Sequence, residues 1–277
     1  MKTRFFGWHP DYPDHRDLKL GSVEIRTMLE RSGKKARAQE TEVPGRVDLR
    51  QWFSPVEDQG ELGSCTANAG AGMFEYFQVR AHGKHIDCSR LFIYKTTRDL
   101  LGMRGDTGAY LRTTMKAMAL FGAPPEKMWP YDVRKFDKEP SAFLYQAASN
   151  FQAMQYYRLD SRDPRATLVN VKESLAAGMP VMFGFSVFDN LDDEQGLFPM
   201  PDRRSGFLGG HAVVASGYDD EKEVGSEKGA LLLRNSWGTE VGESGYYWMP
   251  YGYVTEGLAE DFWSLVDAEF IDTELFE

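Results

Sequence analysis

The stretch VEDQGELGSCTANA, residues 56–69, contains one of only two cysteines in the chain. Cys65 follows Gly63 and Ser64 and precedes small and apolar residues whose spacing of three and four predicts one buried helix face. At a helix N-terminus, unpaired backbone N–H groups and the macrodipole favour an anion, which predicts a thiol pKa shifted toward the thiolate. A lone cysteine is also commonly a small buried hydrophobic residue. The rest of the sequence has to distinguish a nucleophile from a core thiol.

Length and composition place the chain among soluble globular proteins. It has 277 residues, of which 42% are hydrophobic and 27% charged. No run approaches the roughly 20 apolar residues of a membrane span. The opening MKTRFFGWHPDYPDHRD has no apolar signal core. We therefore expect a cytoplasmic protein, or one exported without a classical signal peptide, with no membrane partner.

Charge and cysteine content exclude two further classes. The formal net charge is -10, and phosphate binding rests on clustered positive charge, so nucleic acid is not an expected partner. The short basic cluster at residues 31–37 is interpreted as a solvated or cleavable segment. Two cysteines cannot form a disulfide framework. The oligomeric state stays open.

Apolar periodicity divides the chain into an extension and two lobes. Residues 1–42 form an N-terminal extension, a short prosegment or a structural arm, with a helix-compatible polar stretch. Helical spacing dominates about 43–155, and short apolar runs punctuated by Gly, Pro and Asp indicate strands over about 156–265. Residues 266–277 are a tail. A boundary between such lobes is a favoured place for an active-site cleft.

Two distant residues complete a candidate catalytic set with Cys65. His211 heads an apolar strand behind two glycines, and Asn235 ends a buried strand beside Trp237. Alone, His211 reads as a satisfied core histidine and Asn235 as the start of a turn. Together, Cys, His and Asn supply a thiolate, a proton carrier and an orienting amide. The side chain of Gln59, with the Cys65 backbone N–H, would form an oxyanion hole.

Around these residues the sequence resembles the papain-like cysteine peptidases, from about Val43 to Leu265. The opening VPGRVDLRQWFSPVEDQGELGSCTANA resembles the start of a mature papain-type domain. The segments GDTGAYLRTTMKAMALFGAPPEKMWPYD, GMPVMFGF, GGHAVVASGYDD and LLLRNSWGTEVGESGYYWMPYGY follow in the family's order. The resemblance implies an α+β fold with two lobes, a helical left lobe and an antiparallel β-rich right lobe, and a cleft between them. It implies hydrolysis of peptide bonds in peptide or protein substrates through a Cys65 thioester, without a cofactor.

The resemblance also assigns roles to individual residues. Cys65 would be the nucleophile, His211 its base and acid, Asn235 the orienting residue and Gln59 the oxyanion donor. The substrate-binding residues it implies are Gly108, Gly184, Gly209, Ala212 and Trp237. Of these, Gly108 would pair with an extended substrate, Trp237 would shield the His–Asn hydrogen bond, and the other three would line the S2 pocket.

The chain departs from the family pattern at four places. Thr66 replaces the aromatic residue that usually follows the cysteine, and Leu62 replaces a usual disulfide cysteine, which fits a reducing compartment. Val241 stands where many members have a second tryptophan. The interval between His and Asn is longer than usual, and residues 219–229 are predicted to hold the extra length as a loop. None of these changes removes a group that the chemistry requires.

Two weaker signals are interpreted as structural. His82, His85 and Cys88 would share one face of a continuous helix, but Gly83 interrupts it and no fourth ligand is evident, so no metal site is predicted. The acidic residues 188–196 could steer basic substrates, but we interpret them as a solvated loop.

Two other classes of function remain open at this stage. An acyl transferase or amidase would use the same thioester with an amine as acceptor. A non-catalytic binding module would retain only the scaffold, which the intact set of four catalytic residue types argues against. The extension suggests regulation: we expect residues 1–42 to pack on the catalytic domain and to cover part of the cleft.

Overall fold

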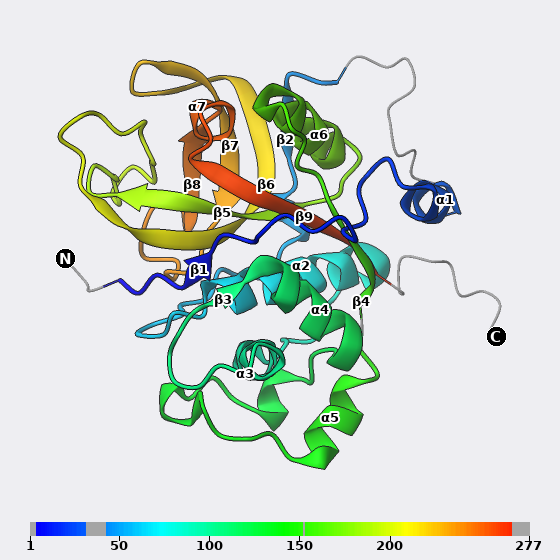
Figure 1. The fold of residues 1–277 in the computed structure, drawn as a ribbon. Helices are drawn as coiled ribbons and strands as arrows, with labels where there is room; N and C mark the ends of the chain where they lie inside the picture. The colour runs from blue at the N-terminus through cyan, green and yellow to red at the C-terminus, as the bar shows by residue number, and fades with distance from the viewer. Residues whose placement is uncertain (1–3, 32–42, 152, 268–277) are drawn as a thin grey trace.

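The helical lobe is built around α2 (Cys65–His82), which lies between α3 (Arg90–Leu100) and the sheet (Figure 1). Small residues bring its neighbours close, as where Gly70 lies against Met118. The helix ends at Gly83, whose left-handed backbone (φ 70°) lets its N–H bond the Val79 carbonyl. The structure, a computed structural model, describes residues 4–31, 43–151 and 153–267.

The other helices follow the periodicity of the sequence closely. The helices predicted within 89–101 and 109–122 are present, the second ending where Gly122 was expected as its cap. Besides α2, the helical segments in the described residues are, in chain order, α1 (Val23–Arg31), η1 (Arg50–Trp52), α3 (Arg90–Leu100), α4 (Leu111–Phe121), η2 (Glu126–Met128), η3 (Val133–Lys135), α5 (Ala142–Ala148), α6 (Pro164–Ala176) and α7 (Gly252–Thr255).

The β-rich lobe is a seven-stranded antiparallel sheet in the order β4-β9-β5-β6-β7-β8, with β2 paired to β6. The predicted two-lobed α+β architecture is therefore confirmed. The strands are β2 (Arg46–Asp48), β4 (Ala153–Arg158), β5 (Val181–Phe188), β6 (Phe207–Val224), β7 (Glu227–Arg234), β8 (Tyr246–Pro250) and β9 (Ala259–Asp267).

The interval between His211 and Asn235 differs from the prediction of a loop. Strands β6 and β7 continue through residues 219–229 and leave only a turn at Gly225 (φ 63°). The segment was predicted to be a loop because it would hold the extra residues between His211 and Asn235, yet two strands that extend together into solvent hold the same extra length. The extra length therefore extends a hairpin beyond the sheet.

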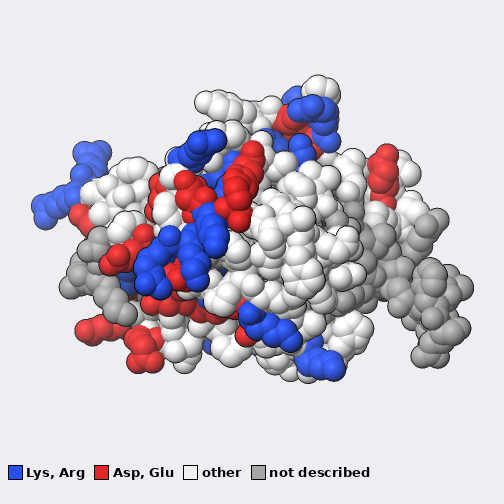
Figure 2. Space-filling view, turned by 90° about the horizontal axis from the view of Figure 1, so that it is seen from below, with Lys and Arg blue, Asp and Glu red and all other residues white. Residues whose placement is uncertain are grey.

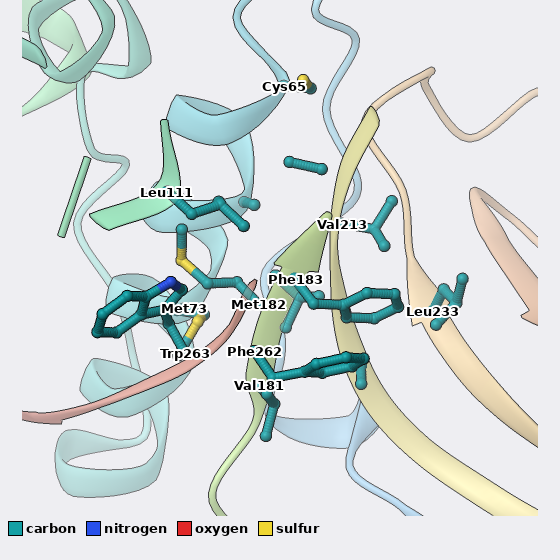
Figure 3. Packing of buried hydrophobic residues seen from close by; sticks show 14 of the residues in the cluster. Cys65, Met73, Leu111, Val181, Met182, Phe183, Val213, Leu233, Phe262 and Trp263 are labelled. Atoms are coloured by element: carbon teal, nitrogen blue, oxygen red, sulfur yellow. The ribbon is translucent and has the colours of Figure 1, made fainter. Parts of the chain in front are cut away.

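The apolar core fills the space between α2 and the inner face of the sheet. Met73 of α2 and Leu111 of α4 face Met182 of β5, whereas the next residue, Phe183, points to the opposite face and stacks on Phe262 with ring centroids 4.7 Å apart (Figure 3). Cys65 lies at the end of α2, at the edge of this core (Figure 3). The packing therefore fixes the end of the helix that carries the thiol.

Surface charges are interspersed on the face of the molecule seen from below, where the helical lobe lies (Figure 2). Two buried cations of α3 pair with more exposed carboxylates, Lys95 with Glu139 at 2.6 Å and Arg98 with Asp137 at 2.8 Å. Within the described ranges, no helix is both long and apolar enough to cross a membrane.

The N-terminal segment runs between the two lobes before it reaches α1 (Figure 1). Within it, β1 (Trp8–His9) pairs in parallel with β3 (Ala109–Tyr110) of the helical lobe. We call residues 4–22 the N-terminal arm. Residues 32–42 of the predicted extension and most of the predicted tail lie outside the described residues.

Candidate active site

Cys65 begins α2 and is completely buried. Burial raises the pKa of its thiol to about 11, although the backbone N–H groups of Ala212 and Gly7 act in the opposite direction. The pKa shift expected from the helix N-terminus is therefore wrong for this arrangement, because the loss of water outweighs the favourable backbone dipoles. Ala212 follows His211 in the chain, so the same contact brings β6 to the thiol.

His211 lies on β6, and its protonation pattern is fixed by Asn235. Its Nε2 lies 2.8 Å from Oδ1 of Asn235, and that same oxygen accepts the Ser236 N–H at 2.8 Å. Because Oδ1 acts as an acceptor, Nε2 carries the proton of the neutral ring. Nδ1 is buried without a hydrogen-bond partner among the described residues. Burial lowers the pKa of His211 to about 4.

Trp237 covers the His–Asn pair. Its ring stacks on the imidazole of His211, with centroids 4.7 Å apart and planes at 19°. The indole is itself largely buried. A hydrogen bond beneath such a cover is screened less by water than an exposed one.

The side-chain amide of Gln59 is held in one orientation. Its Oε1 accepts the Ser236 hydroxyl at 2.6 Å, and its Nε2 donates to the carbonyl of Leu62 at 2.8 Å. The same Nε2 also donates to the carbonyl of Phe5 in the N-terminal arm, at 3.1 Å. The amide thus points at a carbonyl oxygen that comes from outside the catalytic lobes.

Ser236 is a positioning residue that sequence reasoning missed. Besides its hydroxyl contact, its carbonyl accepts the backbone N–H of Gln59 at 2.9 Å. It therefore links Gln59 to Asn235, its neighbour in the chain. Its place between Asn235 and Trp237 was the available signal.

The backbone of the N-terminal arm passes close to the start of α2 at Gly7. A side chain at this residue would overlap the carbonyl of Gly63, directly before the catalytic helix. On the other side, the Gly7 carbonyl accepts the Ala109 N–H at 2.7 Å, and a side chain at Gly108 would overlap the same carbonyl. Two backbones therefore meet over the thiol, with glycine at each close approach.

Aromatic side chains of the arm lie against two of the glycines predicted to bind substrate. Phe6 lies against Gly209 and meets the ring of His211 edge-on, with centroids 6.0 Å apart. The indole of Trp8 fills the space above Gly184. Gly108, Gly184 and Gly209 thus all contact the arm, whereas the S2 assignment stays a prediction.

Arg4 is the first described residue of the arm and contacts the β-rich lobe. Its guanidinium carbon is 3.7 Å from the Trp237 ring centroid, and it forms an ion pair with Asp193. The acidic segment 188–196, interpreted as a solvated loop, therefore has a partner at Asp193. A sequence of this kind does not distinguish a solvated carboxylate from a paired one.

The following part of the arm is held by buried ion pairs. Asp17 bonds Arg112 through both carboxylate oxygens at 2.7 Å, and Asp11 pairs with Arg112 at 3.2 Å. The Asp11 N–H donates to Asp261 at 2.7 Å, and Asp261 pairs with Arg158 at 2.6 Å. Burial raises the pKa of Asp11 and that of Asp261, the latter to about 7.

The second cysteine takes no part in this site. Helix α2 ends at His82, so His85 and Cys88 do not share its face. The backbone N–H of Cys88 donates to Glu75 at 2.8 Å, and its thiol lies 3.4 Å from the Ile86 carbonyl. No group of His, Cys, Asp and Glu arranged to hold a metal ion occurs within residues 4–31, 43–151 and 153–267.

The known proteins that this chain resembles in sequence and in structure are cysteine proteases or peptidase-like proteins. The profile of the family described as papain family cysteine protease matches residues 43–264. An uncharacterised peptidase C1-like protein of Acanthamoeba polyphaga mimivirus is 34% identical, over 94% of this chain and 86% of its own. The crystal structure of xylellain, a cysteine protease from Xylella fastidiosa, is 33% identical, covers 97% of this chain and 99% of that one, and has a TM-score of 0.76. Digestive procathepsin L 3 of the Tenebrio molitor larval midgut, 22% identical, shares the fold with a TM-score of 0.63 over 83% of this chain and 72% of that one.

Proposed function

The chain belongs to the papain family of cysteine proteases, and from this premise we propose that it hydrolyses peptide bonds through a thioester on Cys65. His211 acts as base and acid, Asn235 orients it and Gln59 donates to the oxyanion. The observation that carries the proposal is the His211–Asn235 hydrogen bond of 2.8 Å, which leaves Nδ1 unprotonated and without a hydrogen-bond partner in the part of the chain that the structure describes. That nitrogen is the group needed to accept the thiol proton.

The reaction follows from these positions. Nδ1 of His211 takes the thiol proton, and the sulfur of Cys65 bonds to the peptide carbonyl carbon. The oxyanion accepts hydrogen bonds from the Gln59 amide and the Cys65 backbone N–H. The carbon–nitrogen bond then breaks as His211 protonates the departing amine. Water, deprotonated by His211, attacks the thioester, and the second product leaves as a carboxylate while the thiol is restored.

The contact between Gln59 and Phe5 supports the oxyanion role. A carbonyl oxygen already accepts from the side-chain amide at 3.1 Å. Ser236 holds the other end of the amide, so the donor is in place before any substrate arrives. Such preorganised donors are among the largest contributions to catalysis.

The proposal includes latency: the N-terminal arm keeps the full-length chain inactive. Cys65 and His211 both have 0% exposure under the arm. Burial favours the neutral thiol and the neutral imidazole, which is the less reactive pair of protonation states. Departure of the arm returns water to both groups, and the resulting ion pair is the active form.

Labelling with a thiol-reactive peptidyl epoxide, followed by peptide mapping, tests both parts. We expect strong labelling of Cys65 but not Cys88 in a Gly7→Val variant, and weak labelling of the unmodified full-length chain. Cys65→Ala removes the label and His211→Ala slows it. Equal labelling of the two cysteines would sink the mechanism. Equal labelling of Cys65 with and without Gly7→Val would sink the latency.

Hydrolysis and acyl transfer share the thioester, so the products decide between them. Mass spectrometry of a cleaved peptide with and without an added amine distinguishes the two. We expect the free carboxylate to dominate in both conditions. A dominant amine adduct would assign the chain to the transferases.

A further inference from the structure

A cation site lies at the end of the cleft beside Trp237. The guanidinium of Arg4 stacks on the indole at 3.7 Å and pairs with the Asp193 carboxylate. Only 14% of the Arg4 side chain and 26% of the Asp193 side chain are exposed. An aromatic face with a carboxylate at its edge matches a planar guanidinium, which stacks and donates in one geometry.

The acidic half of this site is held by the catalytic domain itself. The Tyr247 hydroxyl donates to Asp193 Oδ1 at 2.9 Å, and the Gly242 N–H donates to the Asp193 carbonyl at 2.7 Å. Tyr247 lies on β8 and meets Trp237 edge-on, with centroids 5.7 Å apart. These contacts involve no residue of the arm, so the site persists when the arm leaves.

The site lies on the His211 side of the cleft. Trp237 stacks on His211, the group that protonates the departing amine in the proposed reaction. Farther along the arm from Arg4, Trp8 and His9 pair with β3, and Trp8 packs on Gly184. A residue above Trp237 is therefore beside the segment that departs as the amine product.

We propose that Asp193 and Trp237 select an arginine side chain in the departing segment of the substrate, and that Arg4 occupies this site in the latent chain. The inference rests on the proposed function and names a substrate class for it. Lysine is the weaker ligand, because its compact ammonium cannot stack as a plane. The net charge of -10 further favours the approach of basic peptides.

The test compares matched peptides on the full-length Gly7→Val variant. Each fluorogenic peptide carries arginine or its neutral isostere citrulline at the first or second position after the cleaved bond. At one of these positions we expect kcat/KM to be about tenfold higher with arginine than with citrulline. This is the effect expected from one partly buried charge pair combined with stacking on an aromatic ring. Asp193→Asn should bring this ratio close to one.

Glu194→Gln is the matched control. It removes one negative charge from the same segment, and Glu194 is exposed, outside the ion pair with Arg4. The ratio should stay near tenfold in this variant. An equal fall in both variants, or equal cleavage of the arginine and citrulline peptides by the parent, overturns the site.

Failure of the proposed function gives a different result. In that case the Gly7→Val variant cleaves none of the peptides, which overturns the function and this inference together. Folding of each variant is verified by its circular dichroism and melting temperature. Asp17→Asn, which loosens the arm at a distant point, provides a second background in which the ratio must hold.

Discussion

The two halves of the N-terminal arm contact the rest of the protein through different interactions, ring packing and backbone contacts in the first half and ion pairs in the second. Residues 4–9, the cleft segment, lie on groups that a substrate also needs, including His211 and the Gln59 amide. Residues 11–17, the clamp segment, pair with Arg112 on α4 and Arg158 on β4, away from the thiol. Under the latency proposed above, a substrate would compete with the first half and leave the second in place. The clamp then keeps a displaced cleft segment nearby, at a high effective concentration.

The largest expected effect comes from breaking the cleft segment at Gly7. A side chain in Gly7→Val overlaps the Gly63 carbonyl, and overpacking of a close contact costs on the order of 3 kcal/mol. We expect peptide hydrolysis by the full-length chain to rise roughly a few hundredfold. Initial rates with a fluorogenic peptide measure it.

Gly21→Val is the matched control for this change. Gly21 belongs to the same arm, and a side chain there meets nothing within 4 Å. Its rate should equal that of the unmodified chain. A similar rise in both variants would mean that the close crossing at Gly7 does not restrain activity.

The reactivity of the Cys65 thiol should shift with the cleft segment. Burial raises its pKa to about 11, from an ordinary 9.0, so the thiolate fraction at pH 8 is about a hundredfold lower in the covered chain. Alkylation by iodoacetamide should therefore need higher pH in the unmodified chain than in Gly7→Val. The rate constant of Cys65 modification between pH 6 and 10 measures this shift. Superimposable profiles would contradict it.

Weakening the clamp segment should give a smaller rise in activity. Asp17→Asn removes a buried charge that pairs with Arg112. Asp11 is then the only carboxylate among the described residues that pairs with Arg112, and we expect the weaker clamp to raise hydrolysis about tenfold. Asp14→Asn is the control, because Asp14 pairs with Arg16 within the arm. Combined with Gly7→Val, Asp17→Asn should add little, since an arm already displaced no longer restrains the rate.

The smallest effect concerns pH. Burial raises the pKa of Asp11 and of Asp261 in the docked chain, so the docked form binds more protons than the free one. Docking is therefore favoured at low pH and weakens as pH rises toward about 7, even though Arg112 and Arg158 oppose the shift. The rate of the unmodified chain relative to Gly7→Val should rise about threefold from pH 5 to 8. Asp11→Asn should flatten this slope.

The candidate catalytic residues could be picked out from the sequence because each belongs to a local motif. Gln59, Cys65, His211 and Asn235 stand in short stretches whose composition carries the signal. Helix boundaries were predictable for a similar reason, since Gly83 and Gly122 end α2 and α4 through local backbone geometry.

Residues that act through distant partners were harder to find. Ser236 orients Gln59 across a separation of 177 residues; its place between Asn235 and Trp237 marks it as part of the site, but does not identify Gln59 as its partner. Phe6 and Trp8 pack against Gly209 and Gly184 of the β-rich lobe, which are far from them in the sequence. The sequence did not predict that Asp193 pairs with Arg4, because the composition of an acidic segment does not show whether its carboxylates are solvated or paired.

The bond between Asp11 and Asp261 also sets an order of events during synthesis. The two residues are separated by 250 positions, and Asp261 belongs to β9, which pairs with both β4 and β5. A ribosome adding about 5–20 residues each second delivers Asp261 roughly 10–50 s after Asp11. His211 and Asn235 emerge earlier than Asp261. The nascent chain therefore contains Cys65, His211 and Asn235 before it contains Asp261, so the Asp11–Asp261 contact that helps hold the arm forms only after all three have been made.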